Sequence, residues 1–283
     1  MKKFAPIIVI ATLVLATLAC SINVNAPTVK TGNVETLDIN EAAPSGSDFT
    51  RLDLQMGAGT LNLAPGAQTL IQGTIRYNVA DWKPVIARDQ NNVRIEQGHI
   101  DQVKLPTKEV INDWNLKLGS SPIDLTISAG AYKGTLDFSG LALVNLSISD
   151  GASQSEVHFD SPNPSEMQRL QYKTGASEVK LVNLGNANAD TISFESGAGS
   201  YTLDFSGSLK RDVTADISTG VSSLKIIVPN GVPCKLTISG GLNNVTPTGT
   251  WTISSNIYEK GGSGPRVDIN LTMGLGSLEL VNQ

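Results

Sequence analysis

The sequence predicts an all-β protein, a flattened β-solenoid with about 22 residues in each coil. Three observations support this prediction: glycines recur at that interval, a large apolar residue precedes each glycine by three positions, and apolar residues alternate with polar ones on both sides. A repeat of this length is typical of stacked units, none of which can bury its apolar face alone. The recurring glycines are Gly57, Gly119, Gly130, Gly151, Gly175, Gly197, Gly220, Gly241 and Gly274.

The alternation around each glycine predicts two strands joined by a corner. After Gly197, for example, apolar residues return at Tyr201, Leu203 and Phe205. Strict alternation is typical of strands with one buried face. The last apolar residue before a glycine and the first one after it are an odd number of positions apart, so one straight strand cannot turn both inward. We therefore expect a structural corner at each glycine, with backbone angles that glycine adopts more readily than other residues.

The spacing of two glycines indicates how many strands a coil contains. Gly119 and Gly130 are half the usual interval apart, and the segment 123–127 lies between them. This arrangement predicts a coil with two strands and two corners. An antiparallel β-sandwich or meander has similar alternation and is the alternative fold. The constant offsets from one repeat to the next favour the solenoid.

Residues 1–20 predict a lipoprotein-type signal peptide. Two lysines precede a short apolar run that is too short to span a bilayer comfortably. The run ends directly before Cys20 and resembles the bacterial lipobox, although Thr17 stands where leucine is usual. We expect Cys20 to be lipidated and to hold the chain on the outer side of a bacterial membrane. Ordinary secretion, with Cys20 left free, is the alternative.

The remaining chain divides into three parts. Residues 21–48 are polar, contain scattered proline and glycine, and are expected to form a tether. Residues 49–113 hold the first repeat and a capping lobe, in which we expect a hairpin between 69–79 and 85–97. Residues 114–283 carry the regular array of solenoid repeats.

Composition excludes two classes of protein. A formal net charge of -5 gives no basic face for nucleic acid. Two cysteines cannot form a disulfide framework.

Residues with reactive side chains are few, and their positions favour structural roles. His99 and His158 have no spaced partners that would form a metal site, so we expect both at the surface. Cys234 has the inward phase of its strand, which favours a buried structural thiol over a reactive one. Asp137 and Asp204 share an outward column but lie about three coils, or ~14 Å, apart, too far for a catalytic carboxylate pair. We expect no catalytic residue, cofactor or metal.

The outward positions four and two before each glycine form a flat ladder of mostly hydroxyl and amide groups. This ladder is either a binding face for a glycan or a partner sheet, or an ordinary soluble β-surface. Four before the glycines stand Asp53, Asn115, Thr126, Ser147, Gln171, Ser193, Asp216, Thr237 and Asn270. Two before them stand Gln55, Lys117, Ser128, Ser149, Lys173, Glu195, Ser218, Ser239 and Thr272.

Four segments, 54–63, 77–84, 111–116 and 149–153, resemble the toast-rack family of bacterial surface proteins. The resemblance extends over residues 50–283. It implies a β-solenoid fold, related in style to adhesin head domains, and a place in the cell envelope. It implies no catalytic residues.

Together these observations predict a non-enzymatic, lipid-anchored surface module that acts as an adhesin, an envelope-binding protein or a scaffold. Its expected partners are the membrane, through the lipid, and a glycan or envelope protein whose identity the sequence does not indicate. Two alternatives are an envelope-stress sensor that acts through a membrane partner and a polysaccharide-active enzyme. The enzyme would need a carboxylate cluster.

Overall fold

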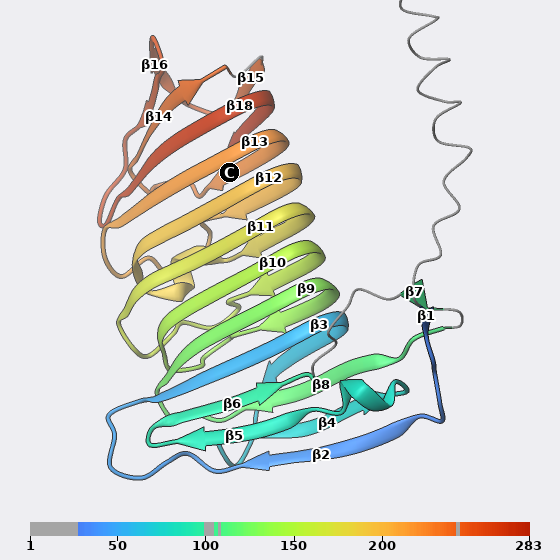
Figure 1. The fold of residues 1–283 in the computed structure, drawn as a ribbon. Helices are drawn as coiled ribbons and strands as arrows, with labels where there is room; N and C mark the ends of the chain where they lie inside the picture. Colours follow the sequence, from blue (N-terminus) through green and yellow to red (C-terminus); the bar gives the residue numbers. More distant parts are fainter. Residues whose placement is uncertain (1–27, 99–104, 107–108, 242–243) are drawn as a thin grey trace, which may run out of the picture.

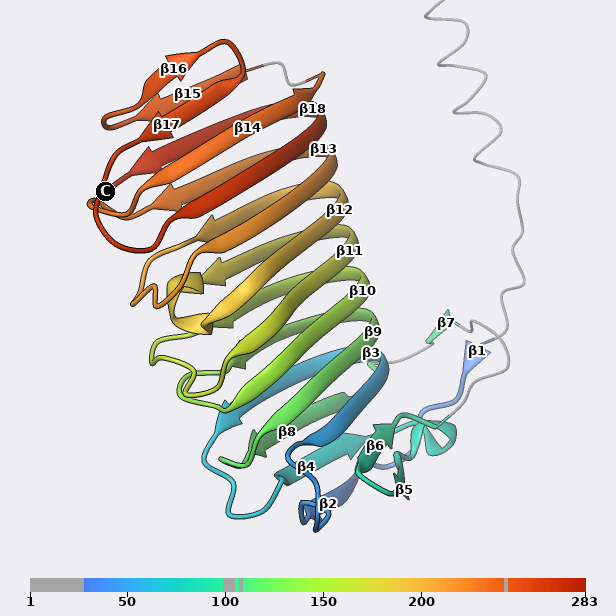
Figure 2. The ribbon, with the colours of Figure 1, turned by 90° about the vertical axis from the view of Figure 1, so that its left-hand side faces the viewer.

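The computed structural model describes residues 28–98, 105–106, 109–241 and 244–283. It confirms the β-solenoid: long strands pair in parallel with their neighbours and bend together around one edge of the stack (Figures 1 and 2). An antiparallel sandwich would not pair in this way. The long strands are β3 (Thr50–Pro65), β9 (Ile123–Asp137), β10 (Leu143–His158), β11 (Met167–Val182), β12 (Ala189–Asp204), β13 (Val213–Val228) and β18 (Val267–Asn282).

Each long strand turns at its glycine, so its two ends lie in different layers. The strand halves before the glycines pair with one another to form what we call the first half-sheet. The strand halves after the glycines form the second half-sheet. In β10, Leu146 and Ile148 are buried before Gly151, and Ser155 and Val157 are buried after it. The buried phase therefore switches from even to odd positions at the corner, as the odd spacing in the sequence predicts, and the apolar core lies between the two half-sheets.

Pairing in register places the corner glycines in one column. From the first coil to the last, this glycine column is Gly57, Gly130, Gly151, Gly175, Gly197, Gly220, Gly274 and Gly241. The expectation of unusual backbone angles is wrong for these eight glycines, because none of them has a positive φ. Close approach explains them instead: a Cβ atom at Gly197 would lie 2.6 Å from the carbonyl oxygen of Gly175.

Gly119 does not belong to the glycine column, and the prediction for it is wrong. It follows β8 (Asn112–Leu118), which pairs with the second half of β3. A Cβ atom at Gly119 would collide with the Thr69 carbonyl, not with another glycine. Gly119 therefore lies at the opposite edge, and Asn115 and Lys117 leave the predicted ladder for the second half-sheet.

The opposite edge of the stack consists of loops that buried asparagines hold together. Asn163 is 1% exposed and lies in the loop between β10 and β11. Its Nδ2 donates to the carbonyls of Leu143 (2.8 Å) and Ala187 (3.1 Å). Its Oδ1 accepts from the backbone N–H groups of Leu143 (3.2 Å) and Ser165 (2.9 Å). One side chain thus joins its own loop to chain segments on both sides.

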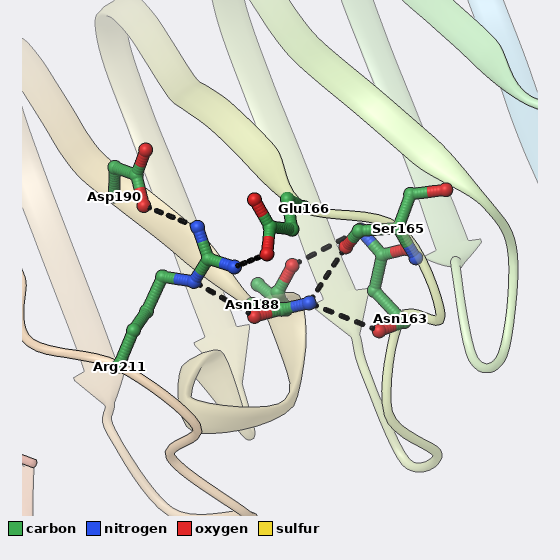
Figure 3. A network of polar contacts seen from close by, with 7 residues as sticks. Asn163, Ser165, Glu166, Asn188, Asp190 and Arg211 are labelled. Carbon is green, nitrogen blue, oxygen red and sulfur yellow. Dashed lines mark hydrogen bonds and ion pairs between the residues drawn. The ribbon is translucent and has the colours of Figure 1, made fainter.

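Arg211 closes the same edge from outside (Figure 3). Its guanidinium contacts Asp190 Oδ1 at 2.6 Å, Glu166 Oε1 at 2.7 Å and, through Nε, Asn188 Oδ1 at 3.1 Å. Asn188 in turn donates to the Ser165 carbonyl at 2.7 Å. The pair of carboxylates raises the pKa of Arg211, so its charge persists. The short 3-10 helix η2 (Leu184–Ala187) lies in this region.

The N-terminal end is capped by short strands that pair differently from the prediction. Strand β4 (Ile71–Tyr77) pairs antiparallel with β8 and with β2 (Glu35–Glu41), whereas β5 (Val85–Asp89) and β6 (Asn92–Glu96) form a hairpin that extends the first half-sheet. The expected hairpin between 69–79 and 85–97 is therefore wrong. The turn at Asn91 joins β5 to β6 instead.

Two contacts complete this cap. Arg88 in β5 forms an ion pair with Glu41 in β2, joining the ends of the two half-sheets. Gln97 directly follows β6, and its side chain covers Gly57 at the first end of the glycine column, where its Oε1 accepts from the Gly57 N–H at 2.8 Å. Because β2 lies within residues 21–48, that segment contributes to the fold from Glu35 onward. The remaining short elements are β1 (Thr28–Val29), β7 (Leu105–Pro106) and the 3-10 helix η1 (Ala80–Trp82).

At the C-terminal end the stacking order departs from the chain order. Strands β14 (Cys234–Gly240) and β15 (Asn244–Thr248) pair with the two halves of β18, which itself pairs with β13. The final strand is thus inserted between β13 and β14. Two further strands, β16 (Thr252–Ser254) and β17 (Ile257–Lys260), extend β14 in antiparallel fashion. They interrupt the regular array predicted for residues 114–283.

Candidate functional site

Apart from Asn115 and Lys117, the predicted ladder lies on the outer face of the first half-sheet, and some of its members contact one another across strands. Asn270 Nδ2 donates to Asp216 Oδ1 at 2.9 Å. Lys173 and Glu195 form an ion pair of 3.2 Å. These contacts link neighbouring side chains into a continuous polar surface.

The outer face of the second half-sheet contains a hollow at the N-terminal end of the stack. Its volume is about 670 Å³, and it extends over β4, β8, β3 and β9. Ala64 lies in this hollow, paired with Lys117 on the neighbouring strand. The polar side chains that line the hollow include Asn62, Gln72, Thr74, Asn115, Thr135 and Asp137.

A second cavity of about 240 Å³ continues the first. It extends over β3, β9, β10 and β11 and is lined by Gln154 and Gly134 among others. Asn62 and Thr135 line both cavities, so the two adjoin. We call the combined depression the trough. Its strands follow one another directly in the sheet, in the order β4, β8, β3, β9, β10 and β11 (Figure 1).

Strand alternation explains why polar groups line the trough. In β3, Leu61 and Leu63 point into the core, so Asn62 and Ala64 face outward. Asn62 is held in place because its Nδ2 donates to Asn115 Oδ1 at 2.9 Å. Farther along, Gln154 Nε2 lies 3.4 Å from Glu178 Oε2.

The charges of the trough cancel. Three lysines and three carboxylates line it, so its formal net charge is zero. The charged residues are Lys117, Lys133, Lys180, Asp137, Glu156 and Glu178. A surface of this kind attracts neither strongly anionic nor strongly cationic ligands.

A buried polar cluster surrounds Asp150, on the inner side of the corner at Gly151. Sequence reasoning did not single out this residue. Tyr172 OH donates to Asp150 Oδ2 at 2.9 Å, and the hydroxyls of Thr174 and Ser177 donate to Asp150 Oδ1. Tyr132 OH lies 3.1 Å from Tyr172 OH. Burial, more than any other cause, raises the pKa of Tyr132 to about 12 and raises that of Tyr172 further. Both phenols therefore remain neutral hydrogen-bonding groups.

The alternation of apolar and polar residues before Gly151 contained a signal for this cluster. Asp150 directly precedes Gly151 and has the same inward phase as Ile148. A carboxylate in that phase must find hydrogen-bond donors when buried. Three hydroxyl groups meet this need.

Asp137 and Asp204 do not form a catalytic pair. Each accepts a hydrogen bond of 2.9 Å from the backbone N–H two residues later, at Ser139 and Ser206. These are Asx-turn contacts that begin the loops after β9 and β12. The two strands are separated by β10 and β11, which corresponds to ~14 Å between the carboxylates.

The remaining predicted residues are also accounted for. Cys234 is 3% exposed in the core, and burial raises its pKa to about 12, so its thiol stays protonated near neutral pH. His158 is partly exposed, 3.6 Å from Glu156. His99 and Cys20 lie outside the described residues.

The described residues form neither a metal site nor a membrane-spanning helix. No group of three or more His, Cys, Asp and Glu side chains there could hold a metal ion. No helix in the described part of the chain combines the length and apolar character that crossing a membrane requires.

Solved structures match most of the chain at low sequence identity. A "putative cell adhesion protein" from Clostridium sporogenes is 22% identical, with a TM-score of 0.49 over 89% of this chain and 99% of that one. A "putative adhesin" from Bacteroides fragilis is 13% identical, with a TM-score of 0.39 over 89% and 99%. A "putative lipid binding protein" from Parabacteroides distasonis is 11% identical, with a TM-score of 0.39 over 89% and 98%. A comparison with curated proteins finds no match.

One protein family matches the sequence directly. Its description is the N-terminal domain of toast_rack, DUF2154, and the matches cover residues 27–169 and 163–227. Together they extend from the N-terminal cap to the end of β13, well over half of the chain. The resemblance noted in the sequence is confirmed: the chain belongs to the toast-rack family.

Proposed function

We propose that this protein is a non-enzymatic, lipid-anchored module of the bacterial cell surface that binds a glycan or another envelope component. The observation that supports binding is the trough, a depression on a continuous hydrogen-bonded sheet with amide, hydroxyl and charged side chains in its lining. Side chains on such a sheet are held in place before a ligand arrives, which reduces the entropic cost of binding. The leader sequence before Cys20 supports the surface location.

Anchoring through Cys20 is expected to move the protein into the detergent phase. In the full chain, wild type should partition with the detergent, whereas Cys20→Ala should stay in the aqueous phase or remain uncleaved. More than one acyl chain is needed for stable anchoring, because each buried methylene contributes roughly 0.8 kcal/mol. Mass spectrometry of the mature N-terminus identifies the modification. An unmodified, free Cys20 in the wild type would contradict lipidation.

Binding is tested with the full chain in mild detergent on an array of bacterial and host-surface glycans. We expect saturable retention on at least one glycan class, which heat-denatured protein should lose. The retained glycan should be recovered intact. Retention on no glycan would contradict glycan binding. Shortened glycan products would contradict the non-enzymatic part of the proposal and favour a polysaccharide-active enzyme.

A further inference from the structure

We propose that the trough binds an uncharged oligosaccharide chain, which lies across strands β4, β8, β3, β9, β10 and β11, along the axis of the stack. This inference rests on the proposed binding function. It adds the site, the class of ligand and its orientation. The argument uses the length of the trough, the chemistry of its lining and the pairing of its strands.

The length of the trough suits a chain of several sugars. Six neighbouring strands are separated by five intervals of ~4.8 Å, which gives roughly 24 Å across them. Each strand offers outward side chains at this same interval, which is close to the length of one pyranose unit in an extended chain. A ligand that lies across the strands therefore meets outward side chains of a new strand at each sugar.

The lining provides the hydrogen-bonding groups that sugar hydroxyls require. The side-chain amides of Asn62, Asn115 and Gln154 both donate and accept. A hydroxyl group also does both, so each amide can bond two neighbouring hydroxyls. Lysines and carboxylates stand beside these amides and can form stronger, charge-assisted hydrogen bonds with the sugar hydroxyls. Because their formal charges cancel, an uncharged chain fits better than an acidic or basic one.

The contacts around Asn62 place this chemistry at the middle of the trough. Asn62 lines both cavities, and its Oδ1 lies 3.4 Å from the backbone N of Thr135. Its Nδ2 is bonded to Asn115. The amide plane is therefore held by neighbours on both sides, before any ligand binds. The small side chain of Ala64, two residues along the same face of β3, leaves this part of the trough open.

The pairing of the strands disfavours an extended peptide as the ligand. Peptides that bind to sheets commonly add a strand at a free edge. Within the trough, β8, β3, β9 and β10 each have hydrogen-bonded neighbours on both sides, so their backbone groups are already paired. The trough is a face rather than an edge. Recognition there must come from side chains.

The experiment measures binding of defined probes to the full chain in mild detergent by isothermal titration. The uncharged probes are hexasaccharides of glucose, mannose, galactose and N-acetylglucosamine. The charged probes are a galacturonate hexamer and a glucosamine hexamer. We expect saturable binding of at least one uncharged hexasaccharide, with at least tenfold weaker binding of both charged ones.

Two variants locate the site. Ala64→Arg places a long side chain in the trough and should weaken binding at least tenfold. Gln154→Ala removes one amide from the far end and should weaken binding severalfold. The matched control is Ser223→Arg, which adds the same side chain at an exposed position of β13 beyond the trough. It should bind as the wild type does, and thermal melts should show that all three variants are folded.

Several outcomes would overturn the inference. Binding that Ala64→Arg leaves unchanged would place the glycan elsewhere, while the proposed function would stand. Preferred binding of a charged hexamer would refute the ligand class. Saturable binding of a capped polar decapeptide, without binding of any saccharide, would assign the trough to a polypeptide. If no uncharged hexasaccharide binds but the glycan array is positive, the inference about the trough is refuted and the proposed function stands.

Discussion

Gly197→Ala is expected to lower the free energy of unfolding by about 3 kcal/mol, because overpacking at a rigid contact commonly costs 1–3 kcal/mol or more. The added Cβ atom would lie 2.6 Å from the Gly175 carbonyl oxygen, closer than real Cβ atoms approach. Both groups belong to the backbone, so neither can rotate away. The strain must push β11 and β12 apart, and a stack stabilised by nearest neighbours then loses contacts along the whole strand pair. Chemical denaturation measures the effect.

Ser200→Ala in the same strand is the control for this substitution. Ser200 is exposed and lies three positions beyond the corner, so its replacement should change the free energy of unfolding by less than about 0.5 kcal/mol. Gly197→Val should be worse than Gly197→Ala, because its methyl groups enlarge the collision. Equal stabilities for Gly197→Ala and Ser200→Ala would show that close approach does not explain the glycine column.

Asn163→Ala is expected to lower the free energy of unfolding by about 3–5 kcal/mol, since each buried polar group left without a partner costs about 1–3 kcal/mol. The wild-type side chain makes four hydrogen bonds, and Asn163 is 1% exposed. Without it, the carbonyls of Leu143 and Ala187 lose these donors in a region that water does not reach. The loops at this edge should then separate. Thermal and chemical denaturation both report the loss.

Asn270→Ala is the matched control at an exposed site. Asn270 makes one side-chain hydrogen bond, to Asp216, on the outer face of the first half-sheet. Its loss should cost about 0.5 kcal/mol, because water replaces the missing partner. A loss for Asn163→Ala as small as that for Asn270→Ala would mean that the loop edge does not depend on its buried asparagine.

The sequence by itself determined the repeat, the strand alternation and the change of phase at each corner. These are local properties: the spacing around Gly151 alone gives Leu146, Ile148 and Val157 their inward phase. The odd spacing required a corner wherever the segment lay in the stack. For the same reason, the inward phase of Cys234 could be predicted without knowing its neighbours.

Sequence spacing alone could not determine which segments become neighbours. The pattern before Gly119 matches that before the corner glycines, although β8 belongs to the second half-sheet, because apolar alternation is the same on either side of the core. Likewise, β14 and β18 have similar patterns, and only their pairing shows that β18 lies between β13 and β14.

The tertiary structure also decided why glycine is needed at the corners and where a ligand can bind. The contact between Gly197 and Gly175 joins two coils, so no single repeat reveals it. The trough combines side chains from six strands, from Thr74 in β4 to Lys180 in β11. Both features arise between segments far apart in the chain. Local periodicity specifies which way a side chain faces, and only the pairing of strands specifies what it meets.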